Sequence, residues 1–414
     1  MISTIDKRLS QFFSQSYSSV RGLVISSLQL IRKIAGFSVV NCWARCIRVQ
    51  PKRILFNSFQ GVYCCNPKGI TEQLMKDHFH EVEIVWVIRR EDNHGIPDGI
   101  RTVLFGTLDF YRYLASSKII VENTIGLQRT LYKKKKCQVL YQTWHGSLGI
   151  KRLDGPVVKG IKWKLRRWSA KKDTNYCLSN SDFETQVFQN SYWPGVKTLN
   201  YGHARNDVFF DQHSETIAPQ IRTLKKNLGI INKKTVLIAP SHYDGESNPF
   251  LDYNFPEIVK AFGDKFGGEW VVLFRLHPRY ISSSLDENMN EVDCVINVTA
   301  VHDMQDLLLI ADAGITDFSS WIFDYLLTYK PGFILHQDED FINYKRGLYF
   351  PFETTPFPIA SNVSELLSNI GSFNSEDYKI KASDFLTEKG CIDDGEAGTR
   401  IAEHILSKVS NDYL

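Results

Sequence analysis

Residues 313–330 read AGITDFSSWIFDYLLTYK and contain a strand, a turn and the start of a helix. The strand ends at Thr316, and an apolar pattern with helical spacing begins near Ser320. A short apolar strand followed at once by a helix is typical of doubly wound α/β domains with parallel sheets. The segment therefore predicts the fold class of the second half of the chain.

The same alternation of strands and helix-length segments extends through most of the sequence. In the second half, strands are predicted at 235–239, 270–275, 295–297, 314–316 and 332–335. In the first half, strands are predicted at 54–57, 84–88, 119–122 and 139–143, with helices at 70–77 and 109–117. This pattern predicts two Rossmann-like α/β domains with a cleft between them.

The predicted domains are residues 53–210, for the acceptor side, and residues 211–414, whose last helix can pack back on the first domain. Residues 1–52 are predicted to form amphipathic helices. Arg32 and Lys33 interrupt the apolar stretch 22–40, which lacks the roughly 20 apolar residues of a spanning helix. No signal-peptide cleavage pattern follows it. We expect this segment to lie on a membrane; the alternative is a helix packed on the first domain.

Charge and cysteine content narrow the function classes. The formal net charge of +3 is small for 414 residues, which argues against a nucleic-acid-binding protein. Residues 1–53, however, contain nine basic residues and one acidic residue, Asp6, so this segment is expected to favour anionic surfaces. The eight cysteines contain no CxxC pair, which indicates reduced thiols and no zinc or redox motif.

Three turns at predicted strand ends carry residues suited to phosphate chemistry. Asp317, Ser319 and Ser320 occupy the first turn, where such side chains either cap the next helix or bind phosphate oxygens. The segment VVLFRLHPR at 271–279 brings Arg275 and His277 to the end of a strand. There they either have a structural role or bind a pyrophosphate group.

The third turn lies in YQTWHGSLGIKRLDGP at 141–156. Gly146 permits a tight turn beside the imidazole of His145. With an ordinary pKa near 6.5, an exposed His145 across a cleft from a phosphate site suits proton transfer from an attacking hydroxyl. The sequence does not separate its acid and base roles.

A basic segment rich in tryptophan follows directly. Residues 159–172 read KGIKWKLRRWSAKK. Such a helix suits a membrane interface or a polyanionic chain, and a solvated basic face is the alternative. The predicted contact residues are Lys162, Trp163, Lys164, Arg166, Arg167 and Trp168.

Together these segments resemble the CDP-glycerol glycerophosphotransferase family, whose members build teichoic acids and related capsule polymers. The resemblance rests on residues 142–147, 202–207, 239–244, 275–278, 316–320 and Asp324, in the family's order. It also includes Asn66, Pro67 and Lys68 in an early turn, and Asp338, Arg346 and Gly347 in a late one. It covers roughly residues 53–405.

The resemblance implies a GT-B arrangement in which the second domain mainly holds the donor, CDP-glycerol or CDP-ribitol. A hydroxyl of a prenyl-linked or polymeric acceptor would attack the distal phosphorus and release CMP at the cytoplasmic face of a bacterial membrane. His145 would be the general base and His277 a ligand of the donor phosphates. No metal or cofactor is required. The implied substrate-binding residues are Arg275, Asp317, Ser319, Ser320, Asp324, Gly146, Ser147, Arg205, Asn206, Asp207, Ser241, Asp338 and Arg346.

Three positions depart from the family pattern, and the last of them leaves the donor open; the acceptor is open because the family includes enzymes that add a first unit and enzymes that extend a polymer. Ala204 stands for the usual Pro of the GxPRND turn, Ser147 for the usual Thr, and residues 241–244 lack the usual Arg. Neither glycerol versus ribitol nor primase versus polymerase is decided. Two alternatives remain: a GT-B glycosyltransferase that uses a nucleotide sugar, and a catalytically silent membrane protein that binds polymer.

Overall fold

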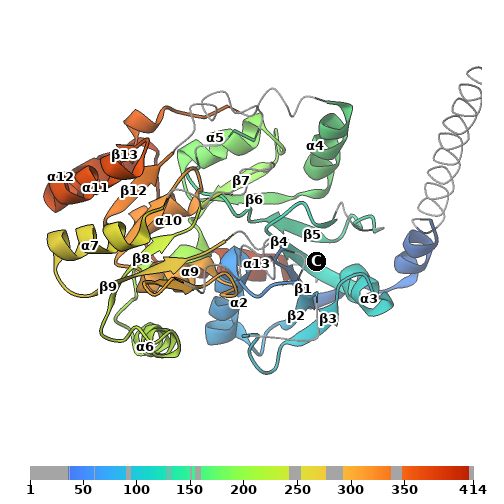
Figure 1. Cartoon of the computed structure of the whole chain (residues 1–414). Coiled ribbons are helices and arrows are strands. Elements are labelled where there is room, and N and C mark those ends of the chain that lie inside the picture. The colour runs from blue at the N-terminus through green and yellow to red at the C-terminus, as the bar shows by residue number, and fades with distance from the viewer. Residues whose placement is uncertain are drawn as a thin grey trace, which may run out of the picture.

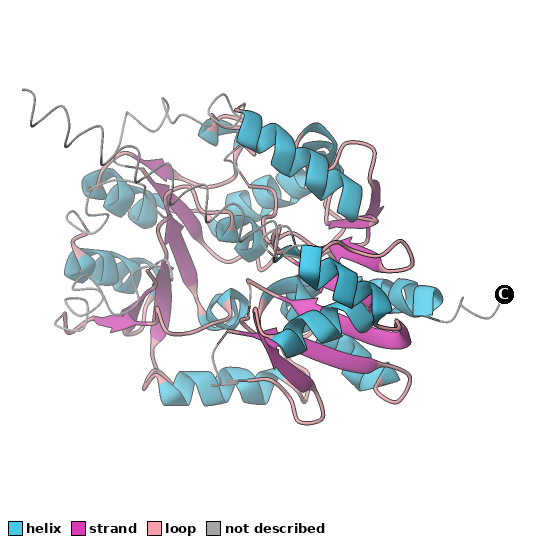
Figure 2. Cartoon of the chain, turned by 90° about the vertical axis from the view of Figure 1, so that its right-hand side faces the viewer, coloured by secondary structure: helices cyan, strands magenta, loops and turns pink. Residues whose placement is uncertain are grey.

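The computed structural model describes residues 36, 38–59, 61–89, 95–127, 130, 132–149, 152–153, 160–241, 253–276, 292–336 and 347–409. Within these ranges the chain forms two parallel sheets, each covered by helices (Figures 1 and 2). The predicted α/β fold with two Rossmann-like sheets is confirmed.

The first sheet has the strand order β3-β2-β1-β4-β5-β6-β7, and all neighbouring pairs are parallel. Its strands are β1 (Gln50–Asn57), β2 (Glu83–Ile88), β3 (Arg101–Leu104), β4 (Ser117–Glu122), β5 (Val139–Gln142), β6 (Tyr176–Ser179) and β7 (Lys197–Asn200). The connecting helices are α2 (Cys65–His78), α3 (Leu108–Ser116), α4 (Ile161–Asp173), α5 (Asp182–Asn190) and the 3-10 helix η3 (Ala204–Phe209).

Alternate residues of the central strands face opposite sides of this sheet. Ile54 and Phe56 pack toward α2, whereas Leu55 packs toward α3. Both sides are apolar because helices cover both faces of a parallel sheet, which gives continuous hydrophobic runs. Ala44, from the helical residues 38–46, is buried in the α3 side. The described end of the N-terminal segment therefore packs on the first sheet; residues 1–35 lie outside the described residues.

The second sheet repeats the same topology, with the order β10-β9-β8-β11-β12-β13 and parallel pairing throughout. Its strands are β8 (Lys234–Ile238), β9 (Trp270–Phe274), β10 (Val295–Asn297), β11 (Ala313–Thr316), β12 (Gly332–Leu335) and β13 (Ile359–Ala360). The helices are α6 (Ile217–Asn227), α7 (Phe255–Phe266), α9 (Met304–Ile310), α10 (Trp321–Leu326), α11 (Val363–Ser372) and α12 (Ser375–Glu388), with the 3-10 helix η7 (Phe352–Thr354).

The chain crosses between the two sheets twice. It leaves the first sheet after η3 and returns through residues 391–396 into α13 (Ala397–Val409). Ile401, Ala402 and Ile405 of α13 are buried in the core of the first sheet, against α2. In Figure 1, α13 accordingly lies among the first-sheet elements, far from α12, which precedes it in the sequence.

Predicted strands agree with the structure in type, and several boundaries differ. β10 and β12 have the predicted bounds, whereas β1 begins at Gln50, four residues before the predicted strand. The strands β3, β6, β7 and β13 are absent from the predictions. They are two to four residues long and carry polar residues such as Arg101 and Lys197, so their apolar signal is weak.

Candidate functional site

The two sheets share a topology that indicates where each of them can bind a ligand. In each sheet the strand order reverses between two neighbouring strands, β1 and β4 in the first and β8 and β11 in the second. Ligands of doubly wound sheets bind beyond the carboxyl ends of the strands at this reversal. Residues after β1, β4 and β5, and those after β8 and β11, are therefore the candidates.

His145 lies in the turn after β5, and its ring orientation is fixed. Its Nδ1 lies 2.6 Å from the backbone oxygen of Asn123, which follows β4. Because a carbonyl oxygen can only accept, Nδ1 carries the proton and Nε2 of the neutral ring keeps its lone pair. The pKa of His145 is lowered to about 4, mainly by burial; the hydrogen bond to Asn123 opposes this shift, and the positive charge of Arg205 adds to it. The neutral imidazole is the form that a general base requires.

Backbone strain concentrates around this imidazole. Outside glycine, the described residues have positive φ angles at Phe59, Cys65, Trp144 and Tyr329. Two of them adjoin His145, since Phe59 contacts its ring and Trp144 precedes it. Cys65 is linked to the turn through Arg205, which donates to Cys65 Sγ and to the Gly146 oxygen. Left-handed conformations of such residues cost free energy and cluster at functional sites. The strain marks this turn independently of its sequence.

The left-handed residue of the turn predicted at Gly146 lies two residues earlier, at Trp144. Trp144 has φ of 53°, and Gly146 does not have a positive φ. The amide of Trp144 donates to Gln142 Oε1 at 2.9 Å, which holds this conformation. Gly146 is required for space instead, because a Cβ there would lie 2.9 Å from Trp144 Nε1. The prediction named the right turn and the wrong reason.

We use first domain and second domain for the first and the second sheet, each with its covering helices. The His145 turn of the first domain reaches the second domain through Leu148 and Gly149. Leu148 is fully buried in the core of the second domain. A Cβ on Gly149 would lie 3.2 Å from the Cβ of Ser320, which directly precedes α10. The His145 turn and the turn at 317–320 therefore face each other across the interface.

In the opposite turn, the serines and Asp317 have different surroundings. Asp317 accepts the backbone amide of Ser241 at 2.8 and 3.0 Å and that of Phe318 at 2.5 Å, so its carboxylate joins the ends of β8 and β11. Ser320 makes no side-chain capping hydrogen bond to α10, and both Ser319 and Ser320 are partly exposed. The capping alternative therefore has no support at Ser320, and its phosphate-binding role stays a prediction.

Arg205 and Asp324 join the two domains beneath the site. Arg205 Nε and Nη2 donate to the Asp324 carboxylate at 3.0 and 3.1 Å, and Nη2 also donates to the Gly146 oxygen at 2.5 Å. Asn206 Nδ2 donates to Asp324 at 3.1 Å. All three side chains are buried. Because their polar atoms serve each other, we assign them to positioning, and the prediction that they contact substrate stays a prediction.

The carboxylate of Asp393 forms hydrogen bonds where the chain crosses between the two domains. Asp393, on the returning segment, accepts the His203 amide at 2.7 Å, Asn180 Nδ2 at 2.8 Å and Asn206 Nδ2 at 3.1 Å. Asn180 Nδ2 also donates to Ser147 Oγ at 3.2 Å. Asp393 is therefore connected both to the His145 turn and to the residues around Asp324.

Asp207, predicted to bind substrate, belongs to η3, and its side chain lies against the start of α13. Its carboxylate accepts the amides of Ala397 and Gly398 at 3.1 and 2.6 Å. Burial raises its pKa to about 7. These two hydrogen bonds connect η3 to α13, so Asp207 has a structural role where the chain returns to the first sheet.

A second inter-domain contact lies beside Arg275. Lys68 Nζ, on α2, bonds Asp303 Oδ2 at 2.8 Å and lies 3.5 Å from Asp306, on α9. Arg275 is buried, and its guanidinium donates to the His302 oxygen at 3.1 Å and contacts Met304 Sδ at 3.1 Å. Arg275 thus orders the segment that enters α9, which presents Asp303 to Lys68.

Some predicted residues lie outside the described residues. They are His277, Asp338 and Arg346, and nothing is described of the side chain of Lys162. Sequence reasoning missed Asn123, Phe59, Asn180 and Asp393 as site residues. Asn123 and Asn180 could have been found, because each is a polar residue just after a short strand. Asp393 gives no local signal, since its partners lie about 190 residues upstream.

The basic helix α4 lies at the outer edge of the first domain (Figure 1). Ile161, Leu165 and Trp168 are exposed, with exposed fractions of 75%, 61% and 61%, and their spacing places them on one helix face. Lys164 and Arg166 are exposed beside them, Arg167 lies over the partly buried Trp163 ring, and Lys172 lies over the Trp168 ring. An apolar stripe with basic flanks is typical of interfacial helices.

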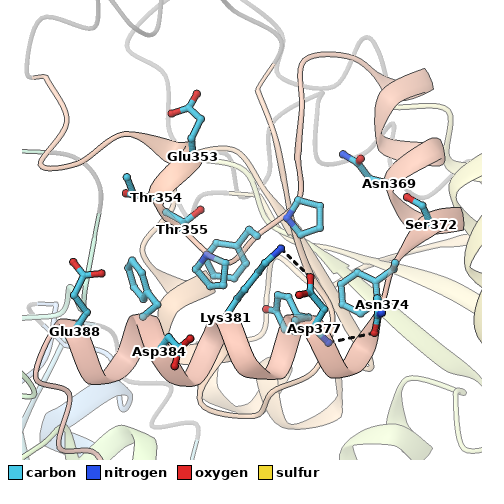
Figure 3. A pocket seen from close by; sticks show the side chains of 16 residues that line it. Glu353, Thr354, Thr355, Asn369, Ser372, Asn374, Asp377, Lys381, Asp384 and Glu388 are labelled. Atoms are coloured by element: carbon cyan, nitrogen blue, oxygen red, sulfur yellow. Dashed lines mark hydrogen bonds and ion pairs between the residues drawn. The ribbon is translucent and has the colours of Figure 1, made fainter.

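The cavity drawn in Figure 3 is separate from this site. It measures about 590 Å³ and is lined by residues 353–358, which lead into β13, and by the end of α11 and α12. Residues that lead into a parallel strand lie at the amino edge of its sheet, opposite the turn at 317–320. Asp377 and Lys381 form an exposed ion pair of 2.8 Å on its wall.

Among the described residues, no group of three His, Cys, Asp or Glu side chains could hold a metal ion. None of the described helices is long and apolar enough to cross a membrane.

The chain is similar to known proteins in sequence and in fold. The model of the family described as CDP-Glycerol:Poly(glycerophosphate) glycerophosphotransferase matches residues 39–407. The teichoic acid poly(glycerol phosphate) polymerase of Staphylococcus epidermidis is 28% identical over 408 residues, covering 92% of this chain and 54% of the polymerase. The chain thus spans about half the length of that relative.

Two further proteins match over nearly their whole length. The teichoic acid glycerol-phosphate transferase of Staphylococcus aureus is 27% identical over 403 residues, covering 91% of this chain and 98% of the transferase. The solved structure of the wall teichoic acid polymerase TagF superposes with a TM-score of 0.77 at 25% identity, covering 94% of this chain and 97% of that one.

Proposed function

Because this chain belongs to the CDP-Glycerol:Poly(glycerophosphate) glycerophosphotransferase family, we propose that it transfers glycerol phosphate or ribitol phosphate from a CDP-alditol to an acceptor hydroxyl. The acceptor is the end of a lipid-linked or polymeric chain in teichoic acid or capsule synthesis. The observation that carries the proposal is the fixed, neutral His145 in a turn that contacts the Ser320 turn of the second domain.

In the proposed reaction, the acceptor oxygen attacks the distal phosphorus of the CDP-alditol. The bond between that phosphorus and the oxygen bridging to the cytidylate breaks, and CMP leaves with that oxygen. Nε2 of His145 takes the hydroxyl proton, since Nδ1 already donates to Asn123. Ser319 and Ser320 hold the donor phosphates. His277 is proposed to join them, on the basis of the family resemblance.

Positioning accounts for much of the remaining rate in phosphoryl transfer, where the protein forms few covalent bonds. The buried Arg205–Asp324 contact and the Asp393 contacts hold the two turns in register. The proposal includes no metal or other cofactor. Transfer is therefore expected to continue in the presence of EDTA.

We propose that the protein works at the cytoplasmic face of the membrane, held there peripherally by α4. The exposed stripe of Ile161, Leu165 and Trp168 would enter the interface, and each neighbouring Lys or Arg would add about 1 kcal/mol on an anionic bilayer. Vesicles rich in phosphatidylglycerol should sediment the protein, and serine at these three positions should reduce the bound fraction. Serine substitutions that leave the bound fraction unchanged would exclude this helix as the anchor.

The donor is tested by supplying CDP-glycerol, CDP-ribitol and a set of nucleotide sugars separately, each with a prenyl-linked acceptor, and by measuring the nucleotide released. CMP from one CDP-alditol supports the proposal and identifies the donor. Release of a nucleoside diphosphate from a nucleotide sugar would indicate a glycosyltransferase instead. No release from any donor, with retained polymer binding, would indicate a silent binding protein. Product chain length then separates a primase from a polymerase.

A further inference from the structure

Phe59 is an exposed aromatic residue inside the candidate site. It follows β1 at the carboxyl edge of the first sheet, and 39% of its surface is exposed. Its ring lies 5.1 Å from the His145 ring, centroid to centroid, at an interplanar angle of 61°. An edge-to-face contact of this kind leaves much of one ring free for other partners. The neighbouring strand residues Leu55 and Phe56 are, by contrast, fully buried.

The backbone of Phe59 is held in a conformation that its side chain disfavours. Its φ angle is 46°, in the left-handed region where Cβ meets the following carbonyl oxygen. The amide of Phe59 donates to Asn123 Oδ1 at 2.9 Å, and Asn123 Nδ2 donates to Ser58 Oγ at 3.0 Å. Glycine would adopt this backbone without strain. A phenylalanine here costs stability and leaves its ring partly exposed, which indicates a use for the ring.

Asn123 sets the spacing between the two rings. Its side-chain oxygen fixes the Phe59 backbone, and its main-chain oxygen fixes Nδ1 of His145. Asn123 itself is fully buried, so both contacts share one rigid support. The ring of Phe59 and the imidazole are therefore placed as a pair.

We propose that Phe59 is the acceptor-side wall of the site: its ring packs on the carbon chain of the polyol whose hydroxyl meets Nε2 of His145. This inference rests on the proposed function and adds a binding residue to it. A polyol presents C–H groups between its hydroxyls, and an aromatic ring can pack on the C–H groups without offering them a competing hydrogen bond. The charged phosphates of the donor have no comparable reason to contact this ring.

Phe59→Gly separates this role from a purely structural one, because it removes both the ring and the backbone strain. Tyr329→Gly is the matched control. Tyr329 also has a positive φ, of 55°, and is 41% exposed, but it lies beyond the end of α10 away from Ser320. Phe59→Tyr keeps the ring and tests rescue. For each variant, CMP release is measured against acceptor and donor concentration separately, together with the melting temperature.

We expect Phe59→Gly to raise the acceptor KM about tenfold or more, as the loss of an apolar contact does, with the donor KM within about twofold and a melting temperature close to that of wild type. Phe59→Tyr and Tyr329→Gly should keep the wild-type acceptor KM. An unchanged acceptor KM in Phe59→Gly, or an equal rise in both KM values, would overturn the inference while leaving the proposed transfer intact. A wild-type protein that releases no CMP from either CDP-alditol would overturn both.

Discussion

Arg205 and Asp324 meet across the boundary between the two domains, in a doubly hydrogen-bonded pair with N–O distances of 3.0 and 3.1 Å. Arg205 belongs to η3 and Asp324 to α10, and their side chains are only 3% and 6% exposed. The same guanidinium reaches the oxygen of Gly146, next to His145. One buried cation thus links the reacting turn to the helix that follows the serine turn.

Removing one member of this pair should strongly destabilise the protein. Asp324→Asn leaves the Arg205 charge buried without its partner, which costs about 3–5 kcal/mol in comparable pairs. Urea unfolding of the variant measures this loss. Lys381→Met is the control, since it breaks the exposed Lys381–Asp377 pair and should cost less than about 1 kcal/mol. Equal costs for the two variants would contradict the assigned role.

Asp393→Asn should weaken both stability and transfer. The carboxylate accepts hydrogen bonds from nitrogen donors of Asn180, His203 and Asn206, and the new amide nitrogen would face at least one of them. Leaving such buried groups unsatisfied costs about 1–3 kcal/mol, and the loosened Asn180–Ser147 contact should lower the rate of CMP release. Asp394→Asn, at the exposed neighbouring carboxylate paired with Arg400, should change either quantity little. An Asp393 variant with wild-type stability and rate would refute this role.

Gly149→Ala tests the contact between the two turns. The new Cβ would lie 3.2 Å from that of Ser320, so one turn must move by a few tenths of an ångström. We expect an increase of a few-fold in the donor KM with little change in melting temperature, because small displacements of binding groups weaken transfer more than folding. Gly160→Ala, where no atom lies within 4 Å of the added Cβ, is the control. A donor KM equal to that of the control would argue against this contact.

The pH dependence of transfer should reflect the lowered pKa of His145, about 4. A base with a lowered pKa stays neutral until the pH falls toward that value, so kcat/KM should lose this group's contribution only well below pH 6.5. The profile must be compared with that of Glu72→Gln, since burial raises the pKa of Glu72 to about 7. Burial also raises the pKa of Asp207 to about 7, so Asp207→Asn is measured as well. An acidic limb near pH 6.5 that persists in both variants would contradict the assigned environment of His145.

The fold could be predicted from local sequence because its strands are continuous apolar runs. Residues 313–316 and 332–335 are buried on both sides, and such runs between helix-length segments have few alternatives. The short strands β3 and β7 could not be found in this way, because polar residues such as Arg101 and Lys197 interrupt their pattern. Their pairing with longer neighbours supplies what the local pattern lacks.

The candidate site could be predicted only in part. His145, Ser319 and Ser320 come directly after predicted strands. Their position at the carboxyl edges of the sheets could therefore be predicted from the alternation of strands and helices. The roles of Arg205, Asp207 and Asp324 depend on which partner each meets, and those partners lie 119 to 191 residues away. The local sequence indicates that these polar side chains belong to functional motifs, but it cannot distinguish a contact with substrate from a contact between the domains.

The most direct test of the account is CMP release by His145→Gln with the active CDP-alditol and a prenyl-linked acceptor, beside His78→Gln as the control. His78 pairs with Glu81 near the end of α2, away from the site. We predict that His145→Gln folds normally and that its rate falls by about 10²–10⁴-fold, the usual contribution of a general base, while His78→Gln keeps the wild-type rate. A folded His145→Gln that releases CMP at the wild-type rate would contradict the central claim that this imidazole is the reaction's base.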